Sequence, residues 1–115
     1  MVIKKRRTIK TLLKFRYAWR GIKYTFKTQK SFRWQLLLGI IALIVFRDFG
    51  VLVFAGLILF AELINTAIEK LCNFVYPHHD RSIGLIKDIS AGAVTVLCIC
   101  SVLYAISLVV RWFLL

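Results

Sequence analysis

Acidic residues are scarce in this sequence, and none occurs before Asp48. Five Asp and Glu residues stand against 17 Lys and Arg residues, which gives a net charge of +12. Twelve of the basic residues lie in residues 1–33, whereas the chain from residue 34 onward carries five charges of each sign. Residues 1–33 thus form a basic head, and the rest of the chain has no net charge. This uneven distribution argues against an ordinary soluble enzyme, whose surface carries charges of both signs interspersed.

Proline and cysteine are also rare. Pro77 is the single proline, so the chain has no proline-rich linker. The three cysteines form no Cys-x-x-Cys pair, which argues against a disulfide framework or a structural zinc site. We interpret Cys72, Cys98 and Cys100 as small buried hydrophobes. No small-residue cleavage site follows the first apolar run, so we expect the hydrophobic segments to remain in the mature chain.

Hydrophobic residues make up 60% of the chain, and the mean hydropathy is +0.78. In residues 9–27 apolar side chains recur at steps of three or four, which predicts a helix. They are Ile9, Leu12, Phe15, Trp19, Ile22 and Phe26. Basic residues fill much of the rest of this segment, and a basic helix with aromatic residues on its apolar face suits a membrane surface. Nucleic-acid binding is a weaker reading of the basic head, because nucleic-acid modules seldom carry spans long enough to cross a bilayer.

Three apolar stretches follow, and they predict an all-α integral membrane protein with one domain over residues 1–115. We expect a surface helix over 1–30 and membrane helices over 31–47, 50–76 and 88–112. A tight turn is expected at residues 48–50 and a polar loop over residues 77–86. The excess of basic residues in the head places the N-terminus in the cytoplasm and the C-terminus outside.

Polar residues interrupt the second apolar stretch at regular intervals. Glu62, Asn65 and Glu69 are spaced i, i+3 and i+7, so they share one helix face. Charged groups inside a bilayer are costly and commonly mark a functional site. The deeper Glu62 suits a general acid or base, and Glu69, nearer to water, suits a hard cation such as Mg²⁺. The alternative is a polar seam that holds helices together.

A second polar cluster is expected to open the third membrane helix. Lys87 at this place can pair with a phosphate, and Asp88 is favourable near a helix N-terminus. The small residues 91–93 are typical of close helix packing. The pair His78-His79 beside Asp80 is weak evidence for a metal. The chain has neither a GxxxxGK[ST] phosphate loop nor a protein-kinase glycine loop. A phosphotransferase with this sequence would have to bind the nucleotide phosphates through other residues.

The segments Glu62-Leu-Ile-Asn-Thr-Ala-Ile-Glu69 and Lys87-Asp-Ile-Ser-Ala-Gly-Ala-Val94 resemble motifs of the small prokaryotic diacylglycerol kinase family, which includes the undecaprenol kinases. Tyr17-Ala-Trp-Arg-Gly-Ile-Lys23 and Phe32-Arg33 extend the resemblance over nearly the whole chain. It implies a homotrimer, each subunit with a surface helix and three membrane helices, and active sites shared between neighbours. It also implies transfer of the γ-phosphate of Mg-ATP to a lipid hydroxyl, of diacylglycerol or undecaprenol, at the cytoplasmic face of the bacterial inner membrane.

The same resemblance implies a role for individual residues. Glu62 resembles the catalytic base, Asn65 should position it or the lipid, and Glu69 resembles the Mg²⁺ ligand. The positions that match nucleotide contacts are Lys10, Tyr17, Gln29, Glu69, Lys87 and Asp88. The expected contacts of the lipid substrate are Trp19, Phe32, Glu62 and Ala91.

The sequence departs from the family pattern at two positions. Many members carry a Glu as a second Mg²⁺ ligand where this chain has Gln29, and an amide oxygen adds no charge to a metal site. Lys10 stands where an Arg often contacts the nucleotide. The Lys ammonium is a point charge, whereas an Arg guanidinium can donate two parallel hydrogen bonds to a phosphate.

Two other classes of function remain open from the sequence. A small transporter subunit would use Glu62 as a proton-coupled binding group. A structural or adaptor peptide would bind anionic lipid through residues 4–33.

Overall fold

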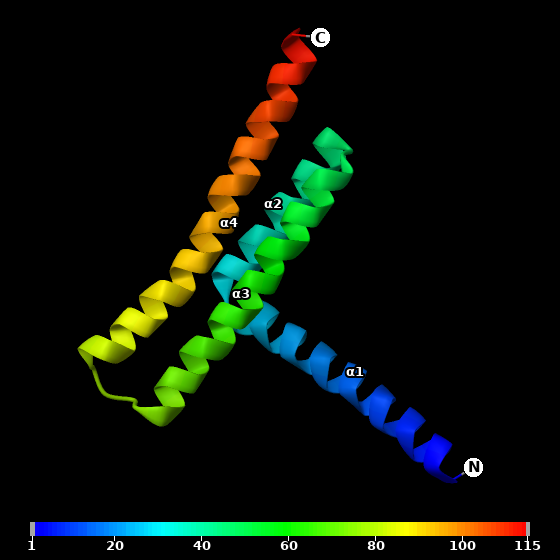
Figure 1. Cartoon of the computed structure of the whole chain (residues 1–115), viewed down its shortest axis with the longest axis vertical. Coiled ribbons are helices and arrows are strands. Elements are labelled where there is room, and N and C mark those ends of the chain that lie inside the picture. The colour runs from blue at the N-terminus through cyan, green and yellow to red at the C-terminus, as the bar shows by residue number, and fades with distance from the viewer. Residues whose placement is uncertain (1, 115) are drawn as a thin grey trace.

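The computed structural model describes the backbone of residues 2–114 and the side chains of residues 5–114 (Figure 1). Within these residues the chain forms four α-helices and no strand. They are α1 (Val2–Thr28), α2 (Lys30–Phe46), α3 (Phe49–Val75) and α4 (Arg81–Leu114). Figure 1 shows α2, α3 and α4 running side by side, while α1 leaves this bundle as a separate rod.

The junction between α1 and α2 is a sharp bend. The two helices meet at 100° around Gln29, which has an extended backbone. The Arg33 side chain reaches back and donates to the carbonyl oxygens of Phe26 and Lys27, at 2.9 and 3.0 Å. These carbonyls belong to the last turn of α1, where no intrahelical donor remains for them. Arg33 therefore caps α1 from the first turn of α2 and holds the bend.

A tight connection joins α2 to α3. Arg47 adopts the left-handed conformation, with a φ of 48°, and its N–H donates to the Leu43 carbonyl. Asp48 then caps α3, because its carboxylate accepts from the Gly50 N–H at 2.9 Å. The expected turn at residues 48–50 is thus shorter in the structure, since Phe49 and Gly50 already belong to α3. The Asp48 carboxylate also accepts a hydrogen bond from the Tyr104 hydroxyl, which joins α4 to this corner.

The connection between α3 and α4 corrects the sequence-based boundary. α4 begins at Arg81, seven residues before the expected start at residue 88, and the loop is limited to residues 76–80. Asp80 explains the difference, because its carboxylate accepts from the N–H groups of Ser82 and Ile83, at 3.0 and 3.2 Å. This is an N-cap, and the next two turns are helical despite their polar residues. Lys87 and Asp88 therefore lie inside α4 and do not open it.

Among the described residues, two helices are long and apolar enough to cross a membrane, α3 and α4. A third span is possible if the bent pair of α1 and α2 is counted as one. At 1.5 Å per residue the 34 residues of α4 extend about 50 Å, well beyond a ~30 Å hydrocarbon core. The polar first turns of α4 can therefore lie outside the apolar layer.

Few side chains of the described part are buried. Within residues 5–114 the buried apolar residues are Phe32, Val51, Ile58, Cys72, Val94 and Leu108. Large apolar side chains cover the outside of the bundle, as expected for a surface that faces lipid or further protein rather than water. The reading of all three cysteines as buried is wrong in part, since Cys72 is buried but Cys100 is exposed on α4.

Candidate functional site

Glu62 is the deepest carboxylate of the described chain. Only 5% of its surface is exposed, and neighbouring Thr66, one turn further along α3, is 4% exposed. The Ser31 hydroxyl donates to the Glu62 Oε2 atom at 3.2 Å. Ser31 lies in the first turn of α2, so Glu62 sits at the level of the bend. A buried charge needs such a partner, because its desolvation is otherwise uncompensated.

The next polar residues of α3 extend the face outward from the bundle. Thr66 donates to the backbone carbonyl of Glu62 at 2.9 Å and not to its carboxylate. Among the described residues, the carboxylate of Glu62 accepts a hydrogen bond from Ser31. Asn65 Nδ2 approaches Glu69 Oε1 at 3.5 Å, the outer limit of a hydrogen bond. The Asn65 Oδ1 atom is buried and has no hydrogen-bond partner among the described residues. An unpaired buried acceptor marks a place where a ligand, a water or an ion is expected.

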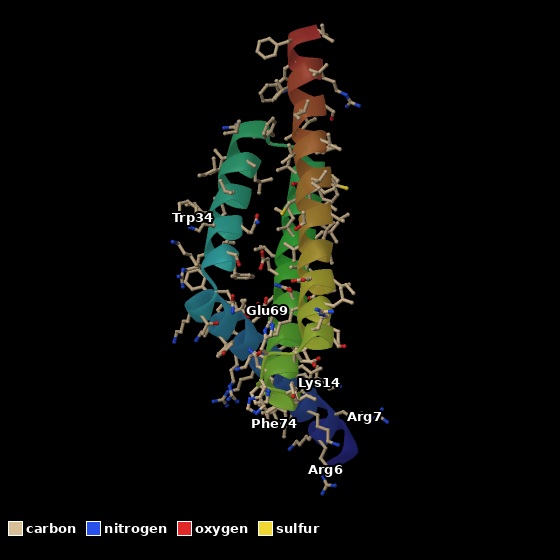
Figure 2. The ribbon with its side chains drawn as sticks, turned by 90° about the vertical axis from the view of Figure 1, so that its left-hand side faces the viewer. Arg6, Arg7, Lys14, Trp34, Glu69 and Phe74 are labelled. Carbon is tan, nitrogen blue, oxygen red and sulfur yellow. The ribbon has the colours of Figure 1, made fainter. Side chains whose placement is uncertain are left out.

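Glu69 lies about 10 Å further along α3 than Glu62, since seven residues separate them at 1.5 Å each. Figure 2 shows Glu69 on α3 close to the height at which α1 leaves the bundle. The next residue, Lys70, joins the two helices there. Its ammonium donates to the Tyr24 hydroxyl at 2.8 Å and lies 4.0 Å from the centre of the Tyr24 ring. Glu62 and Glu69 thus occupy two depths of one face, with Glu62 at the level of the bend.

The first turns of α4 add a cation to this end of α3. The Lys87 ammonium donates to Asn73 Oδ1 at 2.6 Å. Asn73 continues the polar face at i+4 from Glu69. Asp88 is exposed on the neighbouring side of α4. Lys87 therefore points toward the polar face of α3, whereas the side chain of Asp88 is exposed.

The expected nucleotide contacts on α1 stand apart from these carboxylates. Lys10 and Tyr17 are exposed, and Figure 1 shows the N-terminal half of α1 pointing away from the other helices. Tyr17 lines a shallow, largely basic hollow along α1. Its other lining residues are Leu13, Arg16, Trp19, Arg20, Lys23, Tyr24 and Lys27. Glu69 is not among the residues that line this hollow.

Gln29 lies at the bend itself and is half-buried. Its side chain makes no capping bond to α2, so the amide remains available at the level of Glu62. In the described part of the chain, no three His, Cys, Asp or Glu side chains gather as a metal site. That finding includes His78, His79 and Asp80, whose carboxylate is committed to the α4 cap.

An apolar groove lies where α1 crosses α2 and α3. Trp19 and Phe32, two of the expected lipid contacts, both line it. Leu59 and Leu63, which flank Glu62 on α3, line it as well. Phe32 is 4% exposed and forms a wall, whereas Trp19 is 58% exposed at the rim. Ala91, the fourth expected contact, is exposed on α4 and does not line this groove.

The sequence reasoning missed Ser31, Asn73 and Lys70. Asn73 could have been found, because Glu62, Asn65, Glu69 and Asn73 continue one helical spacing. Ser31 and Lys70 carried no such signal. Their roles depend on the 100° bend and on the crossing of α1 over α3, which no local pattern encodes.

The fold and the polar face together define a small helical membrane protein with carboxylates at one end of its bundle. Comparison with known proteins makes the class specific. The profile of the prokaryotic diacylglycerol kinase family matches residues 16–109. A curated protein of Synechocystis sp. (strain ATCC 27184 / PCC 6803 / Kazusa), named "Diacylglycerol kinase", is 34% identical over 101 residues. The alignment covers 80% of this chain and 58% of that protein. The chain belongs to the prokaryotic diacylglycerol kinase family.

Proposed function

We propose that this protein is an ATP-dependent lipid kinase that phosphorylates a lipid hydroxyl at the cytoplasmic face of the bacterial inner membrane. The observation that carries the proposal is the pair of carboxylates at two depths of one α3 face. Glu62 is buried beside an apolar groove, and Glu69 lies two turns further out. Family membership supports the same reaction class.

In this proposal Glu62 acts as the general base. The lipid hydroxyl oxygen attacks the γ-phosphorus of ATP, the bond from that phosphorus to the β-γ bridging oxygen breaks, and ADP leaves. The hydroxyl proton passes to the Glu62 carboxylate. Ser31 orients the carboxylate from one side, and Asn65 lies one turn away to position it or the lipid. Positioning and charge neutralisation are most of what phosphoryl transfer requires.

Mg²⁺ fits the oxygen-rich face around Glu69. The ion prefers one or two carboxylates together with substrate phosphates. Glu69 supplies the carboxylate, and the unpaired Oδ1 of Asn65 is a further oxygen donor. Gln29 lies nearer the level of Glu62, and it is proposed as a ligand because it occupies the position of a metal ligand in the family. When bound, the ion neutralises charge on the transferred phosphoryl group. Lys87 and Asp88 are the nucleotide contacts proposed on α4, with Lys87 at a phosphate.

Lys10 and Tyr17 are proposed to complete the nucleotide site from a second copy. Both side chains are exposed on α1. Tyr17 also lines the hollow that contains Arg16, Arg20, Lys23 and Lys27, whose positive charge suits a polyphosphate. A homotrimer with shared sites would bring the α1 of one subunit to the polar face of its neighbour. In the same arrangement the N-terminus is cytoplasmic, α2 is the first of three spans and the C-terminus is outside.

The substrate test uses the full chain in detergent–lipid micelles with Mg-ATP. Separate reactions contain diacylglycerol, undecaprenol or no lipid, and mass spectrometry detects the phosphorylated lipid. The name of the curated relative supports diacylglycerol. The apolar groove lined by Trp19 and Leu63 supports binding of an apolar chain but does not distinguish the two lipids. Product with one lipid identifies the substrate, and no product with either lipid from a folded protein contradicts the proposal.

Replacing Ser31 by Ala should lower kcat by about 3- to 10-fold with little change in KM for ATP, because one hydrogen bond to the base is worth about 0.5–1.5 kcal/mol. Ser31→Thr keeps the hydroxyl and should restore most of the rate. A Ser31→Thr variant as slow as Ser31→Ala would contradict the positioning role.

Gln29→Glu should strengthen Mg²⁺ binding, so that less Mg²⁺ is needed for activity. A second carboxylate at the bend adds a charged ligand, and ligand charge sets metal affinity. We expect the Mg²⁺ concentration for half-maximal rate to fall by roughly 3- to 10-fold. Thr28→Glu is the matched control, since it adds the same charge one residue away on the exposed end of α1. An equal effect of both substitutions would indicate a general electrostatic effect and not ligation by residue 29.

A further inference from the structure

Apart from Lys10, the N-terminal half of α1 carries charges that the proposed reaction does not use. We define the basic arm as residues 5–14. Residues 1–15 precede the part of the chain matched by the family profile, which starts at residue 16. The arm is nevertheless continuous with the matched part, because α1 runs unbroken from Val2 to Thr28. Its basic residues are Lys5, Arg6, Arg7, Lys10 and Lys14, and all of them are exposed.

No carboxylate balances these charges. The first acidic residue of the chain is Asp48, at the far end of α2. Figure 1 shows the arm extending away from α3, α4 and the loop between them, where the other acidic residues lie. In Figure 2 Arg6 and Arg7 project from the free end of α1 into open space. The arm therefore presents an uncompensated positive surface.

An apolar stripe accompanies the charges. Ile9, Leu12 and Phe15 are 56%, 63% and 71% exposed. They repeat every three residues, and Arg7 and Lys14 lie on the opposite face at 100° per residue. Exposed apolar residues on one face and cations on the other are the pattern of a helix lying in a membrane interface.

The bend decides how the arm meets the membrane. α2 runs with the bundle, and α1 leaves it at 100°, so α1 lies close to the membrane plane when the bundle spans the bilayer. The apolar stripe can then enter the acyl boundary while the cations reach headgroup phosphates. We propose that the basic arm is a binding surface for anionic lipid headgroups, which enriches such lipids beside the site. The inference requires a membrane-embedded chain but not the kinase reaction.

The test measures lipid preference directly. The full chain is reconstituted in phosphatidylcholine bilayers with trace spin-labelled phosphatidylglycerol or spin-labelled phosphatidylcholine, and electron paramagnetic resonance gives the immobilised fraction of each. A Lys or Arg at an anionic surface strengthens binding by a factor of about 5, so we expect an overall preference for the anionic lipid of roughly twofold or more. Salt at about 0.5 M should reduce the preference, because screening shortens the range of the charges.

The decisive variant is the triple substitution Arg6→Gln/Arg7→Gln/Lys14→Gln, which leaves Lys10 and the proposed nucleotide contacts in place. Its preference should fall toward 1. The matched control Arg6→Lys/Arg7→Lys/Lys14→Arg keeps every charge and should keep the preference. Equal immobilisation of both lipids by the unmodified chain, or a triple variant that retains the full preference, would overturn the inference.

Nucleic acid is the competing partner for a basic helix. A fluorescent 20-base-pair duplex added to the detergent-solubilised chain tests it. Duplex binding that disappears in the triple variant, without any anionic-lipid preference, would overturn the lipid assignment. Neither readout uses ATP or turnover, so failure of this inference is distinguishable from failure of the proposed kinase.

Discussion

Glu62→Gln is expected to abolish lipid phosphorylation and leave the protein folded. The substitution preserves the shape of the side chain and removes its ability to accept the hydroxyl proton. General base catalysis contributes about 10²- to 10⁴-fold to a rate, so kcat should fall by at least about 100-fold. Phosphorylated lipid measured by mass spectrometry, with diacylglycerol and undecaprenol in parallel, gives the result.

Stability measurements separate this outcome from a folding defect. Glu62 is 5% exposed and has a single neutral donor, Ser31, so removing its charge should not destabilise the bundle. Replacement of a buried charge by a neutral group of similar shape is often neutral or stabilising. We expect an unchanged or higher midpoint when the variant is unfolded with SDS in mild detergent. Full turnover by Glu62→Gln would exclude Glu62 as the base and favour a role in packing.

Gly50→Ala is expected to destabilise the protein by about 1–3 kcal/mol through overpacking. A Cβ atom on Gly50 would lie 2.8 Å from Cε1 of Tyr104, and closer still to Cζ and the hydroxyl oxygen. The ring cannot move away freely, because its hydroxyl donates to Asp48 and its other neighbour is Phe54, 5.2 Å between ring centres. The first turn of α3 would have to shift from α4. Unfolding in SDS measures the loss.

A double-mutant cycle identifies the cause of that loss. Tyr104→Leu removes the ring, so Gly50→Ala should cost much less in that background than alone, a departure from additivity expected for residues in contact. Gly56→Ala is the matched control in the same helix, since nothing lies within 4 Å of its added Cβ. It should be neutral or stabilising by up to about 1 kcal/mol. Equal losses for Gly50→Ala with and without the Tyr104 ring would contradict the proposed clash.

Helix boundaries show where sequence reasoning succeeds and where it fails. The apolar runs predict α2 and α3 to within a residue or two, because Pro77 and the Arg47-Asp48 pair interrupt the chain locally. The start of α4 is placed seven residues too late. Polar residues after Asp80 resemble a loop, yet the Asp80 cap supplies the bonds that start a helix there. A cap depends on backbone geometry, which hydropathy does not record.

The candidate site also has a part that was predictable from the sequence and a part that was not. The shared face of Glu62, Asn65 and Glu69 follows from the sequence alone, because helical spacing fixes which residues of one helix lie together. The partners that meet this face from other helices depend on how the helices pack. The 100° bend brings Ser31 to Glu62, and the packing of α4 on α3 brings Lys87 to Asn73. Spacing along one helix is a property of the local chain, whereas contacts between helices depend on angles set by packing and capping across the whole bundle.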